Sequence, residues 1–123
     1  MNSDATPIIE KSKFYIESEF KKFLIKKVEV YDEELPGFFY NYYFRFPNRF
    51  GLYLYKNPYM GTGYEKDLWE MRIIHWNRDP WCDFQFIPDP DTRQYEFHEM
   101  SVGQINRWLR RVKDWSFEKY KEL

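Results

Sequence analysis

The chain of 123 residues has one cysteine, two histidines and five glycines, and it contains no long apolar run. A single cysteine, Cys82, excludes an internal disulfide, and we expect a small buried side chain in a reducing compartment. No stretch approaches the ~20 apolar residues of a membrane-spanning helix, so no membrane association is expected. Residues 1–10 lack the basic start and apolar run of a secretion signal. Together these absences predict a cytoplasmic protein.

An excess of charge of one sign is also missing. The chain has 19 Lys and Arg residues against 20 Asp and Glu residues, a net charge of −1, which predicts no whole-chain attraction to nucleic acid or to a membrane surface. The charges are nevertheless unevenly distributed. Residues 101–123 hold six Lys or Arg against three Asp or Glu, whereas residues 77–100 hold two against six. The sequence therefore predicts an electrically polarised molecule.

Catalytic and metal-binding motifs are missing as well. His75 and His98 have no second ligand at a spacing typical of metal sites, and no serine lies in a Gly-x-Ser-x-Gly elbow. Gly61 and Gly63 are not followed by the Lys-Ser/Thr of a phosphate-binding loop. The aspartates between residues 79 and 91 mostly adjoin prolines, where Asp is an ordinary turn residue. We therefore predict no enzymatic activity, no metal and no cofactor.

Aromatic residues are what the chain has in excess, with 12 Phe, 11 Tyr and 5 Trp. Such side chains bury large areas and favour strands, which predicts a folded domain that contains a sheet. Tyrosine hydroxyls need water or a hydrogen-bond partner, so some rings are expected at the surface, where clustered Tyr and Trp favour recognition. The length fits a single domain over residues 1–123.

The middle of the chain predicts an antiparallel meander of four to five strands. We expect strands at residues 38–46, 50–55, 68–76, 81–87 and, as a short fifth, 94–98. Pro47-Asn48-Arg49 closes the first hairpin, and Asn48 is the residue expected to take the left-handed conformation there. Residues 56–67 are rich in Gly, Pro and Asn and predict a loop.

Two helices are predicted to flank this sheet, which makes the fold class α+β. Ser101 and Gln104 form a capping box, and apolar residues then recur every three or four positions, which predicts an amphipathic helix over residues 102–120 packed on one sheet face. Helical spacing after Thr6-Pro7 predicts a first helix over residues 7–25, although Val28 and Val30 fit a strand equally well. This segment is expected to complete the layer or to cover an edge, and a homodimer through that edge is an open alternative.

Three arginines on the last helix are the main candidate contact. Arg107, Arg110 and Arg111 are spaced to lie opposite the apolar stripe, on the solvent side. Asp114 is placed to pair with Arg110 or Arg111, which favours a solvated face as one interpretation. The other is docking onto an acidic protein surface or onto phosphates, for which guanidinium groups are suited.

The predicted loop at residues 56–67 is a second candidate contact. Tyr59 and Tyr64 flank its glycines. Surface loops often carry binding residues, so we expect these two rings to take part in partner contact.

Several segments within residues 40–115 resemble a group of small uncharacterised phage and prophage proteins. Residues 43–51 resemble a hairpin in which Phe-x-Asn-Gly-Tyr-Gly links two strands, with Arg49 in the place of a Gly. The Gly/Tyr-rich loop at 59–65 and the strand that begins Leu68-Trp69-Glu70 are similar too. The last helix also resembles theirs, although residues 101–104 replace a Leu-Thr-Glu-Glu start. The resemblance implies a phage or prophage origin and a four-strand meander closed by one helix, and it brings no function.

These observations predict a non-enzymatic binding protein of phage origin. Its expected partner is a host or defence macromolecule, as for an anti-CRISPR or another anti-defence inhibitor. Three alternatives stay open: a nucleic-acid-binding accessory protein that uses the basic helix, a sponge for a nucleotide signal, and a minor virion or assembly component.

Overall fold

The computed structural model describes residues 16–34, 37–77 and 83–116, and it confirms the α+β class. The strands are β1 (Leu24–Asp32), β2 (Gly37–Phe44), β3 (Phe50–Lys56), β4 (Trp69–Trp76), β5 (Phe84–Ile87) and β6 (Glu96–Met100). The helices are α1 (Thr62–Glu65) and α2 (Val102–Lys113), with short 3-10 helices η1 (Ser18–Phe23) and η2 (Pro58–Met60). The start of the first predicted helix, residues 81–82 of the fourth predicted strand and the end of the last predicted helix lie outside the described residues.

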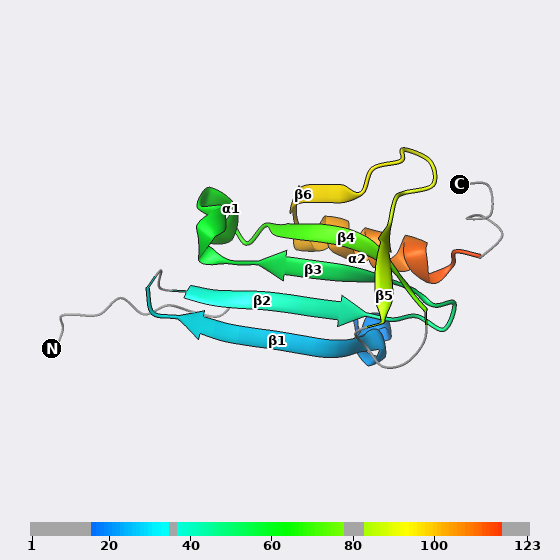
Figure 1. Ribbon diagram of the computed structural model, residues 1–123, viewed down its shortest axis with the longest axis horizontal. Helices are drawn as coiled ribbons and strands as arrows, with labels where there is room; N and C mark the ends of the chain where they lie inside the picture. Colours follow the sequence, from blue (N-terminus) through cyan, green and yellow to red (C-terminus); the bar gives the residue numbers. More distant parts are fainter. Residues whose placement is uncertain (1–15, 35–36, 78–82, 117–123) are drawn as a thin grey trace, which may run out of the picture.

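All strands belong to one antiparallel sheet in the order β1-β2-β3-β4-β5, with β6 also paired to β4. On the side away from β3, β4 pairs with two different strands along its length. Its second half, from Ile73 to Trp76, pairs with β5, and its first half, from Trp69 to Arg72, pairs with β6. The turn after β5 carries the chain from one half of β4 to the other (Figure 1).

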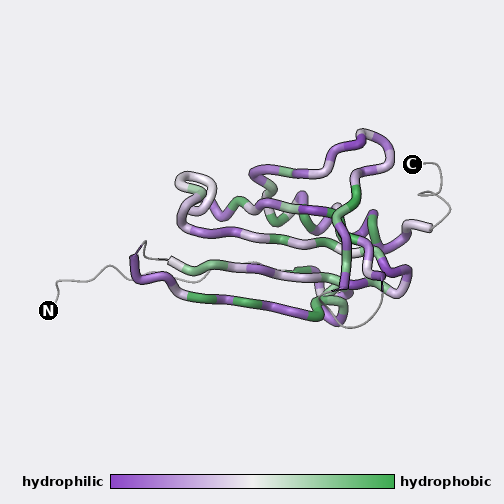
Figure 2. Tube along the Cα trace, viewed as in Figure 1, coloured by the Kyte–Doolittle hydropathy of each residue, from purple (hydrophilic) through white to green (hydrophobic). Residues whose placement is uncertain are grey.

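The helix α2 covers one face of this sheet (Figure 1). Because side chains alternate along a strand, every second residue of β2, β3 and β4 points to this face. Most of these residues are buried, whereas Phe38 and His75 are half-buried. From the helix, Ile105, Leu109 and Val112 are fully buried against them. The trace of α2 accordingly alternates between hydrophobic and hydrophilic residues (Figure 2). The capping box predicted for Ser101 and Gln104 is present.

The turn between β2 and β3 corrects one expectation. Arg49, not Asn48, takes the left-handed conformation, with φ of 72°. The Asn48 side chain instead contacts the last helix: its Nδ2 donates to the carbonyls of Val112, Lys113 and Trp115 at 3.0, 3.1 and 2.9 Å. These carbonyls belong to the end of α2, where the helix itself provides no donors. The helix therefore ends at Lys113, seven residues before the predicted end at residue 120.

The N-terminal part of the described chain also differs from the expectation. A 3-10 helix precedes Leu24, and the chain then continues as β1 rather than as a helix to residue 25. The strand alternative that Val28 and Val30 suggested is confirmed, because both residues pair with β2. Pairing with an aromatic strand outweighs the helical spacing of this segment, as tertiary context commonly does. The segment thus completes the layer as its edge strand.

Candidate partner-binding surface on helix α2

The three arginines predicted as one stripe have three different environments. Arg110 is paired with Glu17, at 2.6 Å between Nη2 and Oε2. Arg111 is paired with Asp89 and Asp91, at 3.1 and 2.8 Å. Arg107 is exposed and has no ion pair among the residues that the structure describes. The expected pairing with Asp114 is not formed within the described chain, since Arg110 and Arg111 both reach other elements.

Arg111 is tied to the fold by a buried carboxylate. Asp89 is 2% exposed, and it accepts from the Asp91 amide and the Thr92 hydroxyl as well as from Arg111. A buried carboxylate needs such partners, because its burial without them is costly. The Arg111 guanidinium also lies over the Trp108 ring, 4.4 Å from the ring centroid. Arg111 is therefore held to the fold by these contacts, although its side chain is still 38% exposed.

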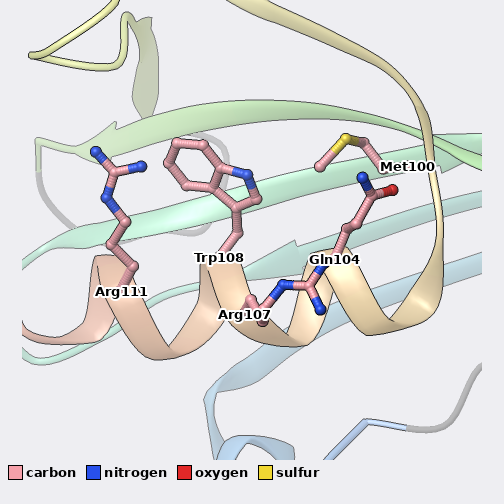
Figure 3. A pocket seen from close by; sticks show the side chains of 5 residues that line it. All are labelled: Met100, Gln104, Arg107, Trp108 and Arg111. Carbon is pink, nitrogen blue, oxygen red and sulfur yellow. The ribbon is translucent and has the colours of Figure 1, made fainter.

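A shallow hollow lies beside these residues, where α2 faces the end of β6. Its volume is about 220 Å³, and its lining residues are Met100, Gln104, Arg107, Trp108 and Arg111. The Arg107 side chain runs along the helix toward Gln104, and Met100 lies beside Gln104 (Figure 3). Two of the five residues predicted as partner contacts, Arg107 and Arg111, thus meet at one site.

Two of the lining residues, Gln104 and Trp108, are held in place by contacts of their own. The Gln104 side chain accepts from the Ser101 amide at 2.9 Å, as the capping box requires. The Trp108 ring packs against Phe97, with 4.9 Å between the ring centroids. Because Trp108 is only half-buried and Met100 is close, the hollow combines an apolar wall with the exposed Arg107 guanidinium. Such a site suits an anionic group that has an apolar neighbour.

The other two predicted contact residues, Tyr59 and Tyr64, do not line this hollow. Tyr59 is 66% exposed and touches Phe39 edge-on. The Tyr64 hydroxyl accepts from the Phe38 amide at 2.9 Å, so this ring holds the η2–α1 segment against β2. Of the two, Tyr59 is the one presented to solvent.

Comparisons with protein-family models, with curated proteins and with solved structures found no match. The resemblance to phage and prophage proteins therefore stays a prediction. The function has to be argued from the arrangement of the side chains.

Sequence reasoning missed a lysine buried among aromatic rings. Lys56 is 3% exposed and paired with Asp67, and its ammonium lies 5.0–5.8 Å from the rings of Tyr40, Tyr64 and Trp69. The signal was present in β3, because alternation from Leu52 and Leu54 places residue 56 on the buried face. The lysine is enclosed by its own fold and offers no site to a ligand.

Sequence reasoning also missed a row of tyrosines on the sheet face opposite α2. Tyr43 stacks on Tyr53, with centroids 4.9 Å apart, and Tyr53 stacks on Tyr55 at 5.4 Å. Phe86 from β5 packs on Tyr53 at 6.0 Å. Burial raises the pKa of all three tyrosines. Because these rings stack on one another, they present edges and hydroxyls more than open ring faces.

The two histidines take no part in these surfaces. His98 is paired with Glu70, and His75 lies against Phe50, with 5.1 Å between ring centroids. Within residues 16–34, 37–77 and 83–116, no group of three or more His, Cys, Asp or Glu is arranged to hold a metal ion. In the same residues no helix is long and apolar enough to cross a membrane.

Proposed function

We propose that this chain is a non-enzymatic binding protein that docks an acidic segment of another protein onto the hollow around Arg107. The observation that carries the proposal is which cations of α2 form ion pairs within the chain. Its other cations, Arg110, Arg111 and Lys113, are paired with carboxylates of the same chain. Arg107 is the α2 cation left without an ion pair among the described residues, and it lies beside an apolar wall.

The chemistry of this hollow favours a carboxylate. A guanidinium forms two parallel hydrogen bonds with a carboxylate, and an exposed unpaired arginine attracts one from a distance. Trp108 and Met100 provide apolar area next to it, and tryptophan and arginine are the residues that most often dominate binding energy at interfaces. A partner segment with an Asp or Glu beside an apolar side chain matches both parts.

Nucleic acid and nucleotides match the surface less well. Tight electrostatic binding of DNA needs many phosphate contacts, whereas Arg110 and Arg111 already neutralise carboxylates of the fold. A stacked base needs an open ring face, and the Arg111 guanidinium covers one face of Trp108. The tyrosines of the opposite sheet face stack on each other instead.

The narrower form of the proposal concerns the partner. A phage protein that engages a host or defence protein, as an anti-CRISPR or another anti-defence inhibitor does, is supported by the resemblance of residues 40–115 to phage and prophage proteins. The genes that flank the coding sequence test this form. Neighbouring antagonists of defence systems support it, whereas head and tail genes point to a virion component.

The broader form is tested by comparing ligand classes on one protein preparation. Immobilised wild type and the Arg107→Ala variant are exposed to the proteome of the bacterium that harbours the gene, to labelled single- and double-stranded DNA, and to free nucleotides. We expect a protein captured by the wild type and depleted on Arg107→Ala, with Arg110→Ala as the matched control that keeps it. Retention of DNA or of a nucleotide, with no Arg107-dependent protein, contradicts the proposal.

A further inference from the structure

Tyr95 is an exposed aromatic residue that the fold itself does not use. Its side chain is 50% exposed, and it makes no ring contact and no hydrogen bond within residues 16–34, 37–77 and 83–116. It directly precedes β6, at the end of the turn that follows β5. Tyrosine is among the residues that most often dominate binding energy at interfaces, which makes this ring a candidate contact.

The alternation of side chains along β6 places the Tyr95 ring on the α2 side of the sheet. Glu96 is paired with Arg72, at 3.5 Å, and Arg72 lies on the sheet face opposite α2. The next residue, Phe97, is buried on the α2 side. Since successive side chains of an extended chain point to opposite sides, Tyr95 points to the same side as Phe97.

Contacts of α2 give the position of Tyr95 relative to the hollow. Trp108 packs on Phe97. One helical turn further along α2, Arg111 is bonded to the turn that leads to Tyr95. The Arg107 side chain runs the other way, toward the start of α2 (Figure 3). Tyr95 and the Arg107 guanidinium therefore stand at opposite ends of the hollow, and the Trp108 ring lies between them.

The two ends of the hollow differ in charge. At the Tyr95 end, Arg111 is already compensated by Asp89 and Asp91, at 3.1 and 2.8 Å. At the other end, the exposed Arg107 has no ion pair among the described residues. Like charges brought together oppose association, so a carboxylate of the partner is favoured at the Arg107 end. An apolar side chain suits the Tyr95 end.

The separation of the two ends selects the conformation of a segment that reaches both. The Arg107 guanidinium lies near Gln104, and α2 rises about 10 Å from Gln104 to Arg111 at ~1.5 Å per residue. In an extended segment, side chains that are four residues apart lie on the same side and about 13 Å from each other. A helical segment needs about seven residues to cover the same distance.

We propose that the acidic segment of the partner lies extended across the hollow, with a carboxylate on Arg107 and an apolar side chain, four residues away, on Tyr95. This inference rests on the proposed function and adds a second anchor and a spacing to it. The side chain midway between the two anchors lies on Trp108. Arg107 makes binding depend on the carboxylate of the segment, and Tyr95 makes it depend on the apolar residue.

Selection of a yeast-displayed library of random peptides on the immobilised full chain tests this spacing. We expect the wild type to enrich peptides with an Asp or Glu and an aromatic or large aliphatic residue four positions apart. On Tyr95→Ala the acidic residue stays enriched and the apolar residue at that spacing is lost, whereas Arg107→Ala loses the acidic residue. Tyr31→Ala is the matched control, because Tyr31 is 45% exposed on β1 at the other edge of the sheet, and it keeps both.

The dissociation constant of an enriched peptide, measured by fluorescence anisotropy, gives a second readout. We expect Tyr95→Ala to weaken binding at least about fivefold, as truncation of an interface anchor does. Tyr95→Phe keeps the affinity of the wild type, because the ring provides the contact. Circular dichroism checks that both variants fold.

The outcomes separate this inference from the proposed function. Peptides that are the same on the wild type and on Tyr95→Ala, but lose their acidic residue on Arg107→Ala, overturn the Tyr95 anchor and leave the proposed function standing. A preferred separation of seven residues overturns the extended conformation. Acidic peptides that Arg107→Ala still enriches, or no enrichment on the wild type, overturn both.

Discussion

The guanidinium of Arg111 donates to the buried carboxylate of Asp89, with 3.1 Å between Nη2 and Oδ1. This contact joins α2 to the turn between β5 and β6, the two strands that pair with the two halves of β4. It also removes Arg111 from the set of arginines available to a partner. Because Arg110 is likewise paired with Glu17, Arg107 is the arginine of α2 to which we assign the proposed contact.

Loss of the Asp89 carboxylate is expected to destabilise the fold. Asp89→Ala removes hydrogen bonds from Arg111, Thr92 and the Asp91 amide, and we expect the free energy of unfolding to fall by about 1–3 kcal/mol. Asp91→Ala is the control, because that carboxylate side chain is 63% exposed and exposed pairs contribute about 0–1 kcal/mol. Urea titration measures both values. Equal losses for the two variants contradict the structural role given to Asp89.

The ion pair between the buried Lys56 and Asp67 predicts that a substitution of Lys56 partly restores the stability lost when the charge of Asp67 is removed. Asp67→Asn keeps a side chain that tolerates the φ of 57° at this position but removes the charge facing the Lys56 ammonium. We expect a loss of about 1–3 kcal/mol. Adding Lys56→Met recovers part of that loss, since a buried pair replaced by an apolar side chain is often neutral. A double variant less stable than Asp67→Asn alone rules out this account of the aromatic enclosure.

The two histidines are expected to titrate on opposite sides of pH 6.5. The hydrogen bond and charge of Glu70 raise the pKa of His98 above its ordinary value of 6.5, whereas burial lowers the pKa of His75 below it. The His98 contribution to stability is thus complete below pH 6.5 and lost as the pH rises through its raised pKa. Folding favours the neutral form of His75, so the free energy of unfolding falls as the pH drops from 6.5 through the lowered pKa of His75.

NMR titration of the imidazole resonances measures both histidines in one experiment. Glu70→Gln is expected to return the pKa of His98 toward 6.5 and to leave the pKa of His75 lowered. A His98 resonance that titrates below that of His75 in the wild type contradicts the Glu70 contact.

Local signals in the sequence predicted the elements that depend on near neighbours. The Ser101–Gln104 capping box begins α2 where the spacing placed it, and period-two alternation located β4 to within a residue at its start. What failed depends on contacts far along the chain. Asn48 satisfies the end of α2 more than 60 residues later, and β1 is a strand because β2 pairs with it.

The candidate site was predicted in part for the same reason. Helical spacing put Arg107, Arg110 and Arg111 on one side of a helix, but no spacing tells which carboxylates fold back onto them. Glu17 is 93 residues from Arg110, and Asp89 is 22 residues from Arg111. The distinction between a solvated arginine and a structural one exists only in the folded chain.

The dissociation constant of the captured partner for the wild type, Arg107→Ala and Arg110→Ala, measured by isothermal titration calorimetry, tests the proposed contact most directly. We expect Arg107→Ala to weaken binding by about tenfold or more, since interface arginines of this kind contribute above about 1 kcal/mol, and Arg110→Ala to change it less than about threefold. The denaturant concentration at the midpoint of unfolding should be nearly the same for both variants as for the wild type. Equal affinities for the wild type and Arg107→Ala would contradict the proposal that the hollow on α2 is where the partner binds.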